Sequence, residues 1–79
     1  MTIAIITPGS WQAVVTTTAD TVFQNQSPRE VYLLVGPTAG EPLKAGLLIE
    51  PWKGVVIASG KDVSCSSFVS PASVFYMEV

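Results

Sequence analysis

Apolar residues occur in short runs along this chain, and turn-forming residues separate the runs. Glycine, proline, asparagine or aspartate recurs about every eight to twelve residues, a spacing typical of all-β domains. No window between these breakers is long enough for the apolar repeat of a helix. The runs that predict strands are 3–6, 11–18, 21–24, 30–35, 43–50, 55–59, 63–67 and 73–79.

About seven or eight short strands predict an all-β fold, either a small antiparallel β-sandwich or a jelly-roll-like barrel. Residues 1–79 are enough for one such domain. Residues 1–9 are considered as a short N-terminal arm that docks on a partner, the alternative being an ordinary edge strand. The same two alternatives apply to the apolar run 73–79 at the other end.

Local patterns add detail to three of these strands. In the run 11–18, strict alternation places Val14 and Val15 on opposite faces. Gly46 inside the run 43–50 indicates a bulge or a close backbone approach. Residues 51–54 predict a turn in which proline presets φ and Gly54 takes a positive φ. The run 55–59 is expected to be a buried strand.

The composition indicates that this domain needs a partner. Charged residues are only 13% of the chain and apolar residues are 48%, whereas about 25% of an ordinary domain is charged. A domain this small is marginally stable by itself. Cys65 is the single cysteine and histidine is absent, so an internal disulfide and a histidine-containing zinc site are excluded. Self-association is the expected supplement, with Cys65 as a small core residue.

Two classes of partner are not expected. The four bases, Arg29, Lys44, Lys53 and Lys61, are scattered in a chain of net charge −2, whereas phosphate binding requires clustered cations. No apolar run approaches the roughly 20 residues of a membrane-spanning helix. The N-terminus lacks the basic region of a signal peptide. The sequence therefore predicts neither nucleic-acid nor membrane binding, and synthesis in the cytoplasm.

The sequence predicts no catalytic, cofactor-binding or metal site. Catalysis by a serine or cysteine nucleophile normally uses a histidine base, and the chain has none. The pairs Ser59 with Lys61 and Glu50 with Lys53 are interpreted as residues of solvated turns. The protein is therefore expected not to be an enzyme and to require no cofactor.

A series of turn and strand-end residues carries a resemblance over residues 11–79: Gln24, Asn25, Ser27, Val35, Gly36, Pro51, Gly54, Gly60, Val63, Glu78 and Val79. In this rhythm the chain resembles the small virion-associated structural proteins of tailed bacteriophages. The resemblance implies a capsid decoration or tail-associated module that is present in multiple copies in each virion and has no enzymatic activity.

On this interpretation the chain contacts copies of itself, with a trimer preferred, and the capsid or tail proteins of the particle. The residues expected at the interface are Ile3, Ile5, Ile6, Trp52, Phe75, Tyr76, Met77 and Val79. The alternative is a carbohydrate- or receptor-binding module of a tail or fibre. In that case Trp11 and Trp52, with Tyr32 or Tyr76, would form an aromatic platform for sugar rings.

Overall fold

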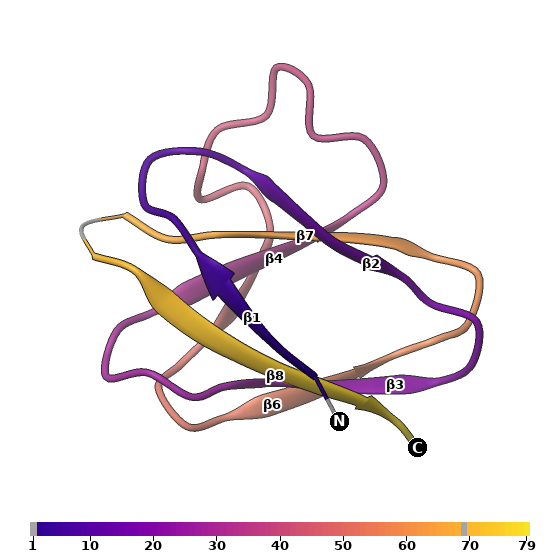
Figure 1. The fold of residues 1–79 in the computed structure, drawn as a ribbon. Coiled ribbons are helices and arrows are strands. Elements are labelled where there is room, and N and C mark those ends of the chain that lie inside the picture. Colours follow the sequence, from indigo (N-terminus) through magenta and orange to yellow (C-terminus); the bar gives the residue numbers. More distant parts are fainter. Residues whose placement is uncertain (1, 69) are drawn as a thin grey trace.

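The computed structural model describes residues 2–68 and 70–79, and these residues form two antiparallel sheets of four strands each. Sheet I contains, in order across the sheet, β1 (Thr2–Ile6), β8 (Ala72–Glu78), β3 (Thr21–Asn25) and β6 (Gly54–Ile57). Sheet II contains, in order, β2 (Gln12–Thr16), β7 (Asp62–Ser66), β4 (Val31–Val35) and β5 (Leu47–Ile49). Figure 1 shows the two sheets packed face to face, with sheet I below sheet II.

The strand pairs show how the chain is wound. β1 pairs with β8, β2 with β7, β3 with β6 and β4 with β5, as in one long antiparallel ribbon folded at the β4–β5 connection. Successive pairs of the ribbon belong alternately to sheet I and sheet II. This winding is the jelly-roll topology. The predicted all-β fold of about seven or eight short antiparallel strands is therefore confirmed, and it is a sandwich of eight strands with jelly-roll winding.

The two terminal strands lie side by side within sheet I. β8 is an interior strand, because β1 pairs along one of its sides and β3 along the other. β1 is an edge strand whose register with β8 runs from Thr2 opposite Tyr76 to Ile6 opposite Ala72. The segment considered as an N-terminal arm thus pairs with its own domain over residues 2–6.

The core lies between the sheets and consists of the inward-facing residues of both. Its largest fully buried side chain is Phe23, whose ring stacks on that of Tyr76 with 5.5 Å between the centroids. Cys65 is fully buried in this core, as predicted, and burial raises the pKa of its thiol to about 12. A thiol in this state is a packing group, because the reactive species is the thiolate.

Two local predictions for the strands are wrong. A β-bulge between Ala13 and Val15 breaks the alternation of β2, so that both Val14 and Val15 pack on the core. An extra residue in one strand lets two successive side chains turn to the same side. β6 is an edge strand rather than a buried one, and its Val56 is 58% exposed.

The connections of β5 differ in part from the prediction. β5 begins at Leu47, and Gly46 precedes it at a close backbone approach, since a Cβ there would clash with the carbonyl group of Leu33. In the following turn the Lys53 amide donates to the Glu50 carbonyl (3.1 Å), and Trp52 has φ of 65°. Trp52, rather than Gly54, therefore takes the left-handed conformation that a turn of this kind requires.

The turn after β3 is held by a buried polar network. Asn25 Nδ2 donates to the carbonyls of Arg29 (2.6 Å) and Ile49 (3.0 Å), and Asn25 Oδ1 accepts from the Ser27 hydroxyl (2.6 Å). The Asn25 backbone also pairs with residues 52 and 53 of the next turn. Asn25 and Ser27 therefore close two turns and are structural residues.

Candidate interaction surface

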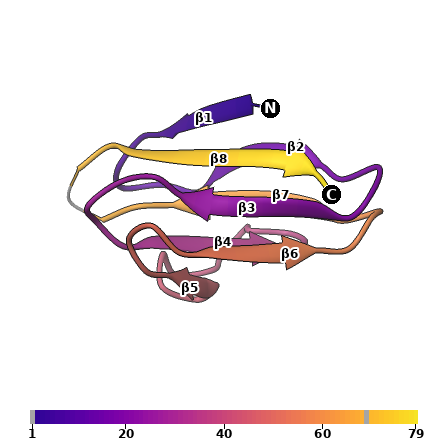
Figure 2. The ribbon, with the colours of Figure 1, turned by 90° about the horizontal axis from the view of Figure 1, so that it is seen from below.

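Among residues 2–68 and 70–79, the outer face of sheet I carries no charged side chain. Inward-facing core residues alternate with outward-facing residues along each of its four strands. Figure 2 looks onto this outer face, and no loop crosses over the four strands. We call it the bare face, and its residues are Ile3, Ile5, Val22, Gln24, Gly54, Val56, Ser73, Phe75 and Met77.

Large apolar side chains of the bare face are exposed to solvent. Ile3 is 54% exposed, and Ile5 and Val56 are each 58% exposed. The strand register brings them into rows, with Phe75 beside Ile3 and with Val22 between Met77 and Val56. The bare face is thus a contiguous apolar patch, a feature that is unusual on the surface of a small domain.

The outer face of sheet II is covered by its own chain. The connection between β4 and β5, residues 36–46, rises over this sheet in Figure 1. We call this segment the covering loop. The buried Ser66 hydroxyl donates to the Leu43 carbonyl (2.8 Å), and Trp11 Nε1 donates to the Glu41 carbonyl (3.1 Å). The covering loop therefore uses the surface that sheet II would otherwise offer to a partner.

Trp52 is exposed at a conformationally strained position beside the bare face. Its side chain is 60% exposed although its φ of 65° is unfavourable for a bulky residue. Its amide donates to the Asn25 carbonyl (2.8 Å), and its carbonyl accepts from Gln24 Nε2 (3.3 Å). The turn thus holds an exposed indole next to the strands of sheet I.

The structure brings together only part of the predicted interface. Ile3, Ile5, Phe75 and Met77 lie together on the bare face, and Trp52 lies at its margin. Exposed Val79 follows the end of β8.

Two of the predicted interface residues point the other way. Ile6 is fully buried, and Tyr76 stacks on Phe23 in the interior. Side chains alternate along a strand, so Ile6 points inward like Ala4 of β1, and Tyr76 points inward like Val74 of β8. The prediction that Ile6 and Tyr76 lie at the interface is corrected on this ground.

Val22 and Val56 belong to the bare face and were not predicted from the sequence. Val22 is followed by the buried Phe23, and Val56 stands between the packed residues Val55 and Ile57, so the alternation of type that marks an outer face is missing around both. The one available signal was the lack of any charge between residues 54 and 59.

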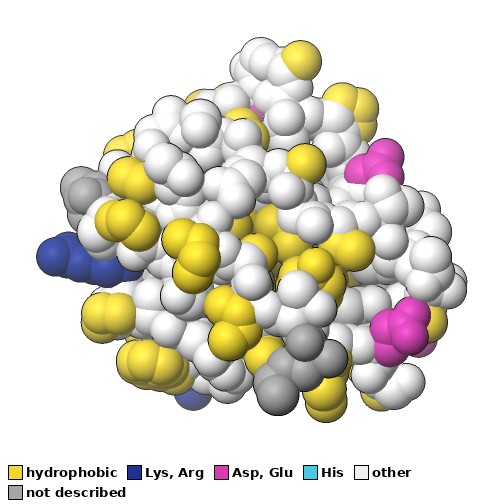
Figure 3. Space-filling model, in the orientation of Figure 1, with side chains coloured by type: hydrophobic (Ala, Val, Ile, Leu, Met, Phe, Trp, Pro, Cys, Tyr) yellow, Lys and Arg dark blue, Asp and Glu magenta, His cyan; other side chains and the backbone are white. Residues whose placement is uncertain are grey.

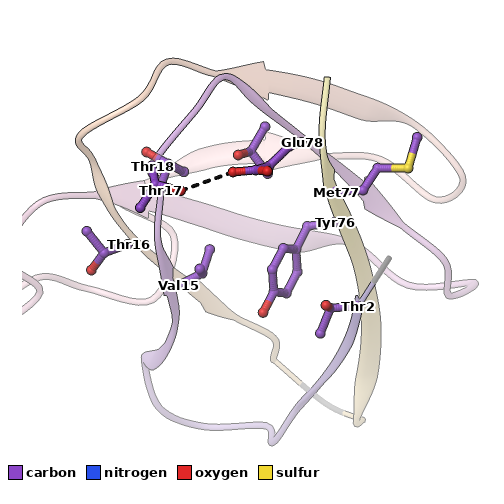
Figure 4. A pocket seen from close by; sticks show the side chains of 9 residues that line it. Thr2, Val15, Thr16, Thr17, Thr18, Tyr76, Met77 and Glu78 are labelled. Atoms are coloured by element: carbon purple, nitrogen blue, oxygen red, sulfur yellow. Dashed lines mark hydrogen bonds between the residues drawn. The ribbon is translucent and has the colours of Figure 1, made fainter.

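A cavity opens at the edge of the sandwich between β1 and β2, where Figure 3 shows hydrophobic side chains inside a hollow. Its volume is about 300 Å³, and we call it the threonine cavity. Figure 4 shows the Tyr76 ring with Val15 on one side and Thr2 on the other, and the hydrogen bond from Thr18 Oγ1 to Glu78 Oε2 (3.0 Å). It is lined by Thr2, Val15, Thr16, Thr17, Thr18, Thr21, Tyr76, Met77 and Glu78.

Several hydroxyl groups of the threonine cavity already serve the fold. Thr17 Oγ1 donates to the Ala58 carbonyl (2.8 Å) and Thr21 Oγ1 to the Ala19 carbonyl (2.8 Å). Among the lining residues that the structure describes, Glu78 is the one ionisable group besides the Tyr76 phenol. The cavity has room for a small neutral molecule.

A second cavity, of about 370 Å³, lies at the loops that join the sheets and contains two of the four bases. Lys44 Nζ lies 4.6 Å above the centre of the Phe68 ring, a cation–π contact. Arg29, Glu30 and Tyr32 also line it. These charged groups are exposed and of both signs, as is usual for a solvated loop surface.

The four aromatic residues considered for a sugar platform lie in different places. Trp11 is held under the covering loop and Trp52 lies in the turn beside Gln24 of sheet I. Tyr32 lines the second cavity, and Tyr76 lines the threonine cavity.

Within residues 2–68 and 70–79, no three His, Cys, Asp or Glu side chains are placed to hold a metal ion. The same residues contain no helix long and apolar enough to cross a membrane.

The comparisons with known proteins add to the fold only. No protein-family model and no curated protein matches this sequence. Among solved structures, the chain is similar to the protein TT1209 from Thermus thermophilus, with 22% sequence identity and a TM-score of 0.64. The similarity covers 94% of this chain and 65% of the TT1209 chain, so this chain spans a little less than two thirds of that protein. At this identity the likeness shows a shared sandwich fold.

Proposed function

We propose that this protein is a non-enzymatic structural component of a bacteriophage particle, made in the host cytoplasm and acting on the capsid as a decoration or stabilisation protein. The observation that carries this proposal is the bare face, an uncharged and exposed apolar surface of four strands. Such a surface binds protein, because it offers shape and apolar area rather than reactive groups.

Two further features support a particle protein. The turn and strand-end residues of the chain resemble those of small phage virion proteins, from Gln24 and Asn25 to Glu78 and Val79. The jelly-roll winding is used by many viral capsid domains, although the same winding also occurs in lectins and enzymes. The bare face is what favours the structural role among these, because it offers apolar area for contact with protein rather than groups for chemistry.

The experiment is to measure the protein in purified particles of the phage that encodes it. Quantitative mass spectrometry is expected to find it in a fixed ratio to the major capsid protein. A particle carrying Val56→Lys is expected to lose the protein, whereas Ala39→Lys on the exposed covering loop is expected to retain it. Particles that lack the wild-type protein would disprove the proposal.

A second candidate, binding of a neutral saccharide, is supported by the threonine cavity. Six of its nine lining residues carry a hydroxyl group, and Tyr76 contributes an aromatic ring. Hydroxyl groups, one carboxylate and a ring are the groups that recognise a polyol. NMR titration with neutral mono- and disaccharides is expected to shift the resonances of Thr2 and Tyr76. Unchanged spectra at tens of millimolar sugar would reject this candidate.

A further inference from the structure

We infer that the bare face is covered by the same face of a second copy of this chain, related by a two-fold axis. The inference rests on the proposed function in one respect, since it names the partner of the surface that carries it. The two sheets I would pack face to face, at the spacing of about 10 Å that stacked sheets adopt. The resulting dimer has four layers of sheet, with the two covered faces outside.

The charge of the chain favours a second copy as the partner of the bare face. Each copy carries a net charge of −2, so two copies repel wherever charged surfaces meet. None of the residues of the bare face is ionisable. It is therefore a surface on which two identical acidic molecules can meet without placing like charges together. A strongly charged partner would find no complementary charge there.

Gln24, the one long polar side chain of the bare face, forms its hydrogen bonds within the same chain. Its Nε2 donates to the Trp52 carbonyl (3.3 Å), and its Oε1 accepts from Gln26 Nε2 (2.9 Å). Both ends of the amide are thus used within the chain. The face presents aliphatic and aromatic groups to its partner, and a second bare face is a partner of that chemistry.

The size of the bare face sets the strength of this contact. Figure 2 looks onto the bare face, where four strands about 4.8 Å apart span roughly 15 Å, and the longest extent of the molecule is 30 Å. Each copy therefore offers about 500 Å², so that two copies bury about 1,000 Å² in total. An interface at this low end of the size range is transient and requires the whole face.

One edge of sheet I, formed by β1, is partly blocked by a side chain of the same molecule. Gln12 Nε2 donates to the Ile5 carbonyl (2.6 Å), and Gln12 Oε1 accepts from the Thr7 amide (3.1 Å). This side chain takes up backbone groups at one end of β1 that another strand would need. Backbone groups that are already occupied at an edge hinder edge-to-edge pairing of sheets. At β1, association through the face is favoured over extension of sheet I.

This geometry specifies a dimer rather than the trimer expected from the resemblance. A flat surface that packs on its own copy makes an isologous contact, which closes at two subunits. A trimer requires two different surfaces on each subunit. The trimer stays a prediction for the assembled particle, where further contacts are available.

The experiment is sedimentation equilibrium of the purified chain from about 1 to 100 μM, the range of ordinary transient dimers. The wild type is expected to be a dimer. Ile5→Lys and Val56→Lys, on the two edge strands of the bare face, are each expected to weaken the dimer at least about a hundredfold, because a two-fold contact buries two unpaired charges. Ala39→Lys adds the same charge outside the face and is expected to leave the dimer unchanged.

Circular dichroism establishes that each variant is folded, and two substitutions on different strands guard against the failure of one. A monomeric wild type at 100 μM would overturn the inference, as would a dimer that both lysine variants retain. A trimer dispersed by the lysines would overturn the two-fold arrangement. These results are separate from the particle experiment: a monomer that still joins particles through Val56 contradicts the dimer alone, and a dimer absent from particles contradicts the proposed function alone.

Discussion

The two outer faces of this sandwich invert the usual relation between residue type and exposure. On sheet II, the small polar residues Ser64 and Ser66 are buried, whereas on sheet I the aliphatic residues Ile5 and Val56 are exposed. The covering loop accounts for the buried Ser66, whose hydroxyl donates to the Leu43 carbonyl. An outward-facing strand residue is therefore solvated only where no other part of the molecule or its assembly covers it.

The winding of the chain explains why the cover lies on sheet II. The β4–β5 connection is the one link along the ribbon that begins and ends in the same sheet, since the other consecutive strands lie in different sheets. A loop of this kind can fold back over the face of its own sheet. The loops that pass between the sheets lie at the ends of the sandwich and leave the bare face open (Figure 2).

The largest effect is expected in the interior that both faces share, where Cys65 lies. Burial raises the pKa of its thiol to about 12, above the ordinary value of 9.0 that the thiol has in the unfolded chain. Between these two values the unfolded chain binds fewer protons than the native one, so stability is intact below pH 9 and falls as the pH rises toward 12. The loss reaches at most ~4 kcal/mol.

This prediction is checked by urea unfolding at several alkaline pH values. Cys65→Ala is the control, since it removes the thiol while the lysines and tyrosines remain. The variant is expected to show a shallower loss of stability above pH 9 than the wild type. Equal slopes would contradict the burial of the thiol between the two sheets.

Displacing the covering loop from sheet II would remove the difference in solvent exposure between the two outer faces. Gly46→Val places a branched side chain against the Leu33 carbonyl and beside the Trp11 ring, where Gly46 now leaves no room. We expect a loss of about 3 kcal/mol in the free energy of unfolding, the upper range for overpacking. Ala39→Val, at an exposed position of the same loop, is expected to change it by less than about 0.5 kcal/mol. Similar values for the two variants would show that the loop is not held at Gly46.

The contribution of the loop's hydrogen bond is tested by Ser66→Ala. The hydroxyl that donates to the Leu43 carbonyl is removed, and the carbonyl is left without this donor. The expected loss is about 1–2 kcal/mol by urea unfolding, as for other buried hydrogen bonds. Ser64→Ala, on the same side of β7, is expected to cost less. An unchanged Ser66→Ala protein would mean that water replaces the loop contact.

Much of this fold could be predicted because the turns are local. Pro8-Gly9, Asn25 to Pro28 and Gly60 end strands through their own backbone preferences, and the strands between them follow from apolar runs. The exceptions are also local but are decided by tertiary contacts. The bulge at Val14 and the positive φ of Trp52 bring a side chain or a backbone group to a partner distant in sequence.

The residues of the bare face were harder to predict from the sequence, because tertiary contacts decide which strand faces are covered. Alternation indicates that Ile3 and Ile5 share a face, but it does not tell which face of a strand turns inward, and Ile6 was assigned to the wrong side. Whether a face is covered depends on where residues 36–46 pack, which is a long-range property. No pattern within β6 distinguishes the exposed Val56 from the packed Val55.

A smaller effect on folding is expected at the margin of the bare face. Trp52→Gly removes the left-handed strain of a bulky residue, worth about 1–2 kcal/mol, and also removes the packing of the indole. Because these terms oppose each other, the free energy of unfolding is expected to change by less than about 1 kcal/mol. Dimer affinity is expected to fall, as measured by sedimentation. A variant with unchanged affinity would place Trp52 outside the contact.

The smallest effect is expected from salt, and it sharpens the comparison by testing the chemistry of the bare face itself. Since none of its residues is charged, screening between about 0.05 and 0.5 M sodium chloride has no ion pair to weaken at the contact. Screening also reduces the repulsion between two chains of net charge −2. The dimer dissociation constant is therefore expected to change by less than about twofold, and in the direction of tighter binding. A dimer that weakens tenfold with salt would be held by charged residues, which lie outside the bare face, and the contact would then belong to another surface of the sandwich.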